Sequence, residues 1–137
     1  TLRSYRSIYR SIYVKMTLGV GAKTFVASET IGGYEVEIRV REGLYEPDIG
    51  GKVATVSFKI NNRFDDLEVE NRVTIARWLY SQWPEAIAFA YAMKAKAIMA
   101  FPNYGDSIPR VQIYQKLGFT ILEEEDPIEP DFMVYWL

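Results

Sequence analysis

The sequence predicts a single α+β domain, residues 1–137, with a mixed, mainly antiparallel sheet flanked by helices. Three observations support this. Apolar and polar residues alternate through much of the first half, as in strands with one buried face. From residue 65 onward, apolar residues recur at helical spacing instead. The chain has 137 residues, of which 49% are hydrophobic, and this is enough for one core.

Four strands are expected before residue 61. The cleanest begins at Tyr34, where Val36, Ile38 and Val40 alternate with charged residues. Gly32 and Gly33 precede it and are typical of a two-residue hairpin turn. The four strands are predicted at residues 12–20, 23–31, 34–40 and 52–60. Residues 42–51, which are rich in glycine and include a proline, are expected to form a loop.

Helices follow in the second half. Asp65, Asp66 and Glu68 crowd a helix start, where negative charge is favourable, and Val69, Val73, Ala76 and Tyr80 continue at helical spacing. Pro84 either breaks this helix or opens a new one. Residues 86–95 are apolar nearly all round, which predicts a buried helix. The remaining expected elements are a short central strand at 97–101, a loop at 102–106, a helix ending at residue 117, and a strand pair at 120–123 and 132–137.

The chain contains no cysteine and no histidine. This excludes disulfides, a thiol nucleophile, histidine-based triads and the usual zinc sites. We therefore expect no metal, and any general base must be a carboxylate, a tyrosine, a lysine or water.

Charge and hydropathy argue against membrane and nucleic-acid partners. The formal net charge is −2, and no run approaches the roughly 18 apolar residues of a membrane span. We expect no signal peptide and a cytoplasmic location. The tandem Arg6-Ser-Ile-Tyr9 and Arg10-Ser-Ile-Tyr13 could stack on bases and neutralise phosphates. Residues 1–11 are instead expected to be a surface or interface arm.

A short helix with a defined stop lies near the C-terminus. Ser107 is a suitable N-cap, and Pro109 fits the first turn. Tyr114 lies on an apolar stripe at three-residue spacing. Gly118 supplies the left-handed residue that ends helices, and Phe119 folds back onto the end.

The run Ile113-Tyr-Gln-Lys-Leu-Gly-Phe119, preceded by Ser107, resembles the C-terminal signature of the GNAT superfamily, the GCN5-related N-acetyltransferases. The resemblance implies acetyl-CoA or another acyl-CoA as co-substrate, in a cleft where the family's fourth and fifth strands separate. It makes residues 52–60 the fourth strand, whose backbone pairs with the pantetheine arm. Tyr114 would protonate the departing thiolate. Glu35 and Glu37, on the neighbouring strand, are candidate bases if they face the cleft, and Glu37 is the one selected. Expected cofactor-binding residues are Val56, Ser57, Phe58, Arg63 and Ser107.

The chain departs from the family at the phosphate-binding loop. No glycine occurs between Gly51 and Gly105, and Asp65, Asp66 and Glu68 place negative charge where the pyrophosphate would bind. If these acids cap the following helix, CoA should bind weakly. Two functions therefore stay open. One is N-acyl transfer to an unknown small-molecule or protein amine. The other is a non-catalytic GNAT-like role through protein partners, as a virion or regulatory component; a homodimer or another protein partner is compatible with either.

Overall fold

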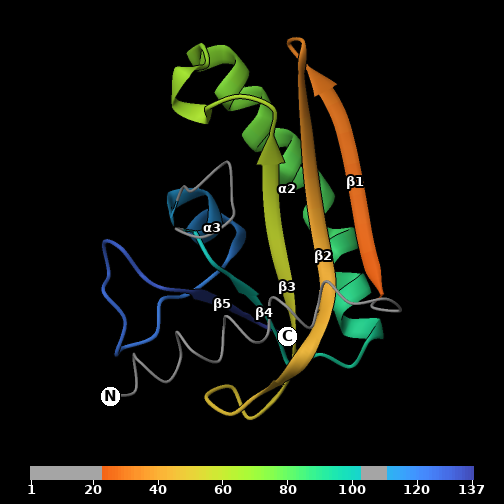
Figure 1. Ribbon diagram of the computed structural model, residues 1–137, viewed down its shortest axis with the longest axis vertical. Coiled ribbons are helices and arrows are strands. Elements are labelled where there is room, and N and C mark those ends of the chain that lie inside the picture. The colour runs from red at the N-terminus through yellow and green to blue at the C-terminus, as the bar shows by residue number, and fades with distance from the viewer. Residues whose placement is uncertain (1–22, 103–110) are drawn as a thin grey trace.

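The computed structural model describes residues 23–102 and 111–137 of the chain. The described part forms one five-stranded sheet in the order β1-β2-β3-β4-β5, with its helices packed against it (Figure 1). In chain order the elements are β1 (Thr24–Ile31), β2 (Tyr34–Glu46), β3 (Gly51–Ile60), the short 3-10 helix η1 (Phe64–Asp66), α2 (Val69–Ala92), β4 (Ala97–Ala100), α3 (Val111–Leu117) and β5 (Met133–Trp136).

The sheet is mixed but mainly antiparallel. β1 with β2, β2 with β3, and β4 with β5 are antiparallel pairs, whereas β3 and β4 run parallel. The predicted α+β class is therefore confirmed, as is the parallel pairing of the central strand with the strand ending at Ile60. The parallel pair is joined through α2, as a parallel connection requires.

Gly32 and Gly33 form the predicted hairpin between β1 and β2. Their φ angles are 58° and 83°, so both lie in the left-handed region. That conformation matches the twist of two antiparallel strands, and glycine adopts it without a Cβ penalty. The turn fixes the register by placing Ile31 opposite Tyr34.

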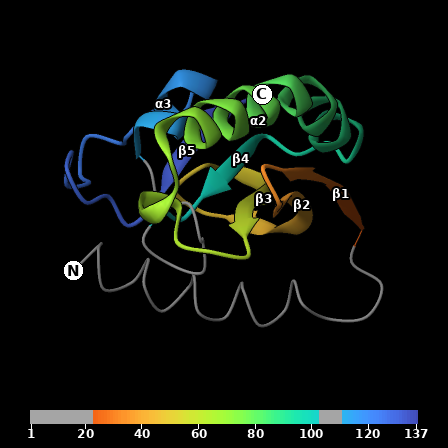
Figure 2. The ribbon, with the colours of Figure 1, turned by 90° about the horizontal axis from the view of Figure 1, so that it is seen from above.

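The long helix α2 and the short helix α3 cover the same face of the sheet (Figure 2). Alternate residues of β2 and β3 point to this face and pack against α2 and α3 in the main core. A smaller cluster on the opposite face lies around the end of the sheet that contains β4 and β5. Its buried members are Ile49, Val53, Ala97, Met99, Phe101, Phe132 and Val134.

Helix α2 differs from its prediction in two ways. Pro84 lies inside one continuous helix and does not break it. Pro84 is exposed, so its ring lies outside the core, and the helix continues without the one N–H donor that proline lacks. The segment 86–95 is also not buried all round, because Ala86 and Ala90 are buried while Ala88 and Tyr91 are exposed. Small alanines on the outer side carry little apolar surface, and the composition alone therefore overstated the burial.

Two segments predicted at the ends of strands also differ. β2 continues to Glu46 through a register shift between Glu42 and Tyr45, so the first part of the predicted loop is strand. Such an irregularity accommodates an extra residue without ending the ladder. Near the C-terminus, Thr120 makes a single bridge to Val134, and the rest of 120–123 is not a strand. The predicted strand at 132–137 is confirmed as β5, which pairs with β4.

Several predictions concern residues outside the described part of the chain. They are the strand at 12–20, the arm at 1–11, Ser107, Pro109 and most of the loop at 102–106.

Candidate functional site

The two neighbours of β3 pair with it to different extents. β2 follows β3 along nearly all of its length, from Gly51 to Ile60. β4 pairs only with Val53–Val56, through Ala97–Ala100. Within residues 23–102 and 111–137, no strand continues the pairing with β3 beyond Val56 on the β4 side (Figure 1).

The direction of the main-chain groups along β3 follows from two hydrogen bonds. The Asn61 N–H donates to the Glu35 carbonyl of β2 at 3.2 Å, and the Lys96 N–H donates to the Lys52 carbonyl at 2.7 Å. Main-chain groups of successive residues point to opposite edges of a strand. Even-numbered residues of β3 therefore face the β4 side. Beyond Val56 these are Phe58 and Ile60, at the place where β4 has separated.

Tyr114 of α3 lies behind this separation, on the helix-covered face. Its ring stacks on Phe58, with centroids 4.8 Å apart and planes 11° apart, and meets Phe119 edge-on at 5.2 Å. Its exposed fraction is 0%. The predicted helix stop is confirmed: Gly118 has φ 108°, and the Phe119 N–H donates to the Tyr114 carbonyl at 3.0 Å. The motif therefore fixes the Tyr114 ring against β3.

An open groove of about 390 Å³ lies between α2 and α3. Val69 and Val73 line it and are 65% and 43% exposed, so the stripe at helical spacing faces this groove. Burial raises the pKa of the Tyr80 phenol, which also lines the groove and stays protonated at neutral pH. The full lining is Phe64, Val69, Arg72, Val73, Ala76, Tyr80, Gln112, Ile113 and Lys116.

Sequence reasoning did not select Arg72 or Lys116 as site residues. Each lies on the groove side of its own helix, and only the packing of α2 beside α3 brings the two cations to one groove. Their positions in the sequence could have indicated them, because Arg72 is next to Val73 and Lys116 follows Tyr114 by two positions.

The three acids before α2 belong to different parts of the structure. The N-cap residue Glu68 makes no side-chain hydrogen bond to the helix. Asp65 and Asp66 belong to the separate helix η1, and Asp66 lies 3.9 Å from the Arg63 guanidinium. The sequence from Asp65 to Val69 resembles a single helix start. In the structure it belongs to two helices, η1 and α2, because Leu67 between them is buried and has an extended backbone.

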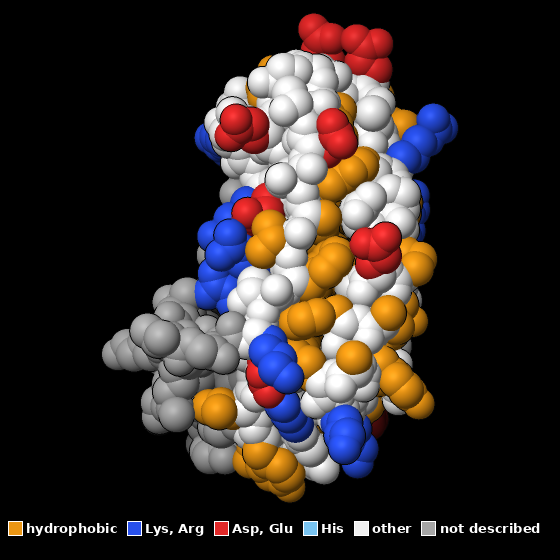
Figure 3. Space-filling view, turned by 90° about the vertical axis from the view of Figure 1, so that its right-hand side faces the viewer, with side chains coloured by type: hydrophobic (Ala, Val, Ile, Leu, Met, Phe, Trp, Pro, Cys, Tyr) orange, Lys and Arg blue, Asp and Glu red, His pale blue; other side chains and the backbone are white. Residues whose placement is uncertain are grey.

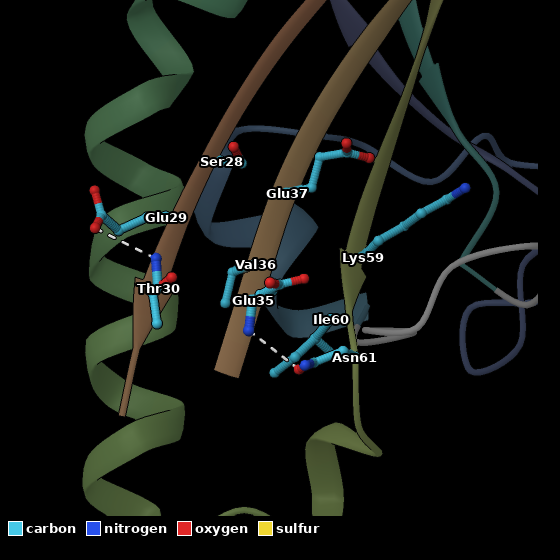
Figure 4. Close-up of a pocket in the computed structure, with 9 residues that line it drawn as sticks. All are labelled: Ser28, Glu29, Thr30, Glu35, Val36, Glu37, Lys59, Ile60 and Asn61. Atoms are coloured by element: carbon cyan, nitrogen blue, oxygen red, sulfur yellow. Dashed lines mark hydrogen bonds between the residues drawn. The ribbon is translucent and has the colours of Figure 1, made fainter. Parts of the chain in front are cut away.

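A second, larger hollow of about 690 Å³ lies at the end of the sheet formed by the β1–β2 hairpin and β3 (Figure 4). Glu37 and Lys59 point to the same side of the sheet in this view and are opposite each other in the strand register. Glu37 also pairs with Arg39 at 3.0 Å. The lining is Ser28, Glu29, Thr30, Glu35, Val36, Glu37, Lys59, Ile60 and Asn61.

The two predicted catalytic residues lie on opposite faces of the sheet. Tyr114 packs with Phe58 on the helix-covered face, whereas Glu37 projects from the other face beside Arg39. Strand alternation explains this, because Glu37 lies between the buried residues Val36 and Ile38. The sheet therefore lies between the two groups.

The predicted cofactor-binding residues are likewise dispersed. Val56 and Phe58 place their side chains in the core, and Ser57 lies opposite Arg39 in the register. Arg63 is 83% exposed in its side chain, at the start of η1. Ser107 lies outside the described residues. Of the atoms of these strand residues, only those of the main chain are therefore placed to pair with a pantetheine arm.

No protein-family model and no curated protein matches this sequence. In the part of the chain that the structure describes, no group of three or more acidic side chains is placed to hold a metal ion. No described helix is both long enough and apolar enough to cross a membrane.

Proposed function

We propose that the protein is a GNAT-type N-acyltransferase that transfers an acetyl or other acyl group from acyl-CoA to an amine. The observation that carries the proposal is the separation of β4 from β3 after Val56, with Tyr114 fixed behind it. An extended pantetheine arm has amides that can pair with a strand edge in the way another strand would. Among the described residues, no strand pairs with Ile60 on the β4 side of β3, and its main chain offers such a place.

The groove between α2 and α3 is the proposed channel for the rest of the acyl-CoA. Its apolar floor includes Val69 and Val73, and its cations are Arg72 and Lys116. Exposed apolar side chains favour contact with the adenine ring and the dimethyl group. The two cations would neutralise phosphates in place of a glycine-rich loop. Glu68 and Glu70 put negative charge at the start of α2, so the proposed attraction for phosphates rests on Arg72 and Lys116.

The hollow beside Glu37 is the proposed site for the amine. Glu29, Glu35 and Glu37 line it against one cation, Lys59, so its local charge favours a positively charged acceptor. The ammonium must lose a proton before it can attack, and Glu37 or a water molecule held by it would accept that proton. Ile60 and Asn61 line this hollow, and Phe64, three residues further along the chain, lines the groove.

The reaction transfers the acyl group in one displacement. The free amine attacks the thioester carbonyl carbon, a C–N bond forms, and the C–S bond breaks. The CoA thiolate then takes a proton. Tyr114 is the proposed donor, because a phenol is still protonated near neutral pH.

Calorimetric titration with acetyl-CoA tests binding, and release of free CoA thiol in the presence of polyamines or a lysine peptide tests turnover. We expect saturable binding, and loss of turnover with retained affinity in Tyr114→Phe, which keeps the stacked ring. Tyr91→Phe, at a tyrosine that is exposed on α2, is the matched control and should change neither. Absence of binding at millimolar acetyl-CoA would contradict the proposal.

A non-catalytic GNAT-like protein that acts through protein partners is the second candidate. The complete burial of Tyr114 favours it, because a ring that lines neither the groove nor the sheet-end hollow serves packing equally well. This candidate predicts that Tyr114→Phe changes stability without changing any acyl transfer, and that acetyl-CoA does not bind.

A further inference from the structure

We infer that the groove between α2 and α3 receives a loop from a second copy of this chain. The loop is the one between α3 and β5, residues 118–132, and the inserted side chain is Ile128. Ile128 is 81% exposed, more than any other large hydrophobic side chain among the described residues. A single exposed apolar side chain is ordinary on a protein surface. Ile128 differs because a restrained loop presents it between carboxylates.

Side-chain hydrogen bonds restrain the loop around Ile128. The Asp126 carboxylate accepts from the Ile128 and Glu129 N–H groups, at 2.8 and 3.2 Å. The buried Glu125 carboxylate accepts from two further main-chain N–H groups of the loop, at 2.9 and 3.3 Å. A proline lies on each side of the Ile128-Glu129 pair and fixes the backbone there. The loop therefore has little conformational freedom to lose when Ile128 enters a groove.

The groove has an apolar floor and two cations. Val69 and Val73 lie about one helical turn apart on α2 and are 65% and 43% exposed. Arg72 and Lys116 line the groove from its two helices, and neither makes an ion pair within the described part of the chain. A branched aliphatic side chain placed on the two valines would remove apolar surface of both copies from water.

The loop and the groove carry opposite charges. Residues 123–129 contain five acids and no cation, whereas the side chains that line the groove include two cations and no acid. Glu129 follows Ile128 directly, so its carboxylate would approach Arg72 and Lys116 when Ile128 lies on the valines. Charge-assisted hydrogen bonds of this kind would fix the orientation of the inserted loop.

The loop of one molecule does not fill that molecule's own groove, because Ile128 is exposed and is not part of the groove lining. In Figures 1 and 2, α3 and the loop that follows it lie on the same side of the molecule. Two copies related by a two-fold axis can therefore exchange loops, each filling the groove of the other. The chain thus contains both halves of one contact.

The inserted loop and the proposed acyl-CoA would occupy the same groove and exclude each other. If the proposed function holds, loop exchange would lower acyl transfer at high protein concentration. The contact is small, so we expect a weak pair that forms at about 100 µM and separates at about 1 µM. Self-association is measured without acyl-CoA, so its result is independent of the proposed reaction.

Sedimentation velocity between about 1 and 100 µM measures the association. We expect the mass to rise from 15.8 kDa toward twice that value. Ile128→Ser should remain monomeric, because it removes the inserted side chain. Val26→Ser is the matched control, since Val26 is a β-branched, 46% exposed residue of β1. Figure 3 looks at the side of the molecule that β1 and α2 form, away from α3.

The Val26→Ser control should associate like the parent protein. A parent protein that stays monomeric at about 100 µM would overturn the inference. Association of Ile128→Ser equal to that of the parent would overturn it as well.

A mixing experiment tests whether the loop enters the groove. Ile128→Ser keeps the groove and loses the inserted side chain, whereas Val73→Glu keeps the loop and brings a repelling carboxylate into the groove. Neither variant should associate alone. An equimolar mixture should form a heterodimer, weaker than the parent pair, because the loop of Val73→Glu fits the groove of Ile128→Ser. A mixture that sediments like the separate variants, or self-association of Val73→Glu, would overturn the loop-in-groove contact.

Discussion

The two edges of β3 differ in how far a neighbouring strand pairs with them. On one side, β2 accompanies β3 along nearly its whole length, and on the other, β4 leaves after Val56. The β2 side is a continuous ladder over a buried core. The β4 side ends in a separation between a groove and a hollow, with an aromatic stack behind it. Within the described residues β3 is paired along one edge and in part along the other, and the proposed binding of an extended ligand uses this difference.

The largest expected effect is at the aromatic stack that fixes the separated side. Phe58 has an exposed fraction of 0% and stacks on Tyr114. Phe58→Ala should lower the free energy of unfolding by about 3–5 kcal/mol, because it leaves a cavity between β3 and α3. Urea unfolding measures this. Ser57→Ala, one position away on the opposite face, should change it by less than about 0.5 kcal/mol. Similar losses in both variants would show that the stack does not hold α3 against β3.

The hairpin tests the fully paired side. Gly32→Ala and Gly33→Ala should each cost about 1–2 kcal/mol of stability, because both positions have positive φ. Gly32→Ala should cost more, since a Cβ at Gly32 would collide with the Asn71 side chain, whereas one at Gly33 meets nothing within 4 Å. Adding Asn71→Ala should reduce the difference between the two. An equal cost in both single variants would show that Asn71 adapts freely.

The groove between α2 and α3 is tested by measuring the affinity for acetyl-CoA. Arg72→Ala and Lys116→Ala should each weaken acetyl-CoA binding by about tenfold, since a charge-assisted phosphate contact contributes roughly 1.5–3 kcal/mol before screening by salt. Both variants should become less sensitive to salt than the parent protein. Lys94→Ala, at an exposed lysine just beyond the other end of α2, is the charge-matched control. Unchanged affinity in the two groove variants would place the phosphates elsewhere.

The smallest expected effect is at the Glu42–Lys52 pair, where β2 and β3 shift register. The hydrogen bond from Lys52 lowers the pKa of the Glu42 carboxyl below its ordinary value of 4.5. Its contribution to stability is therefore complete above that value and lost as pH falls through the lowered pKa. Glu42→Gln should cost about 0.5 kcal/mol at pH 7 and nothing at pH 2, because solvent still screens the pair, whose Lys52 and Glu42 side chains are 37% and 27% exposed. Unfolding curves at the two pH values measure this, and an equal cost at both would exclude the ion pair as its source.

Strands and the helix stop were predictable from the sequence because their signals are local. Alternation at residues 34–40 fixed both faces of β2, and Gly118 with Phe119 fixed the end of α3. The continuity of α2 through Pro84 was not predictable, because it depends on which side of the helix faces water. The groove between α2 and α3 was also not predictable from the sequence. Arg72 and Lys116 are 44 positions apart by their numbers, and tertiary packing alone brings them together.

Amide hydrogen exchange followed by NMR during titration with acetyl-CoA tests the central claim most directly. The Ile60 N–H faces the side that β4 has left, whereas main-chain groups of Lys59 face β2. If the acyl-CoA arm pairs with the main chain of Ile60 on the β4 side of β3, saturation should slow exchange at Ile60 by about tenfold or more, the effect of roughly 1.4 kcal/mol of added protection. Exchange at Lys59 should hardly change. Saturable binding with unchanged exchange at Ile60, or equal slowing at both residues, would contradict the account.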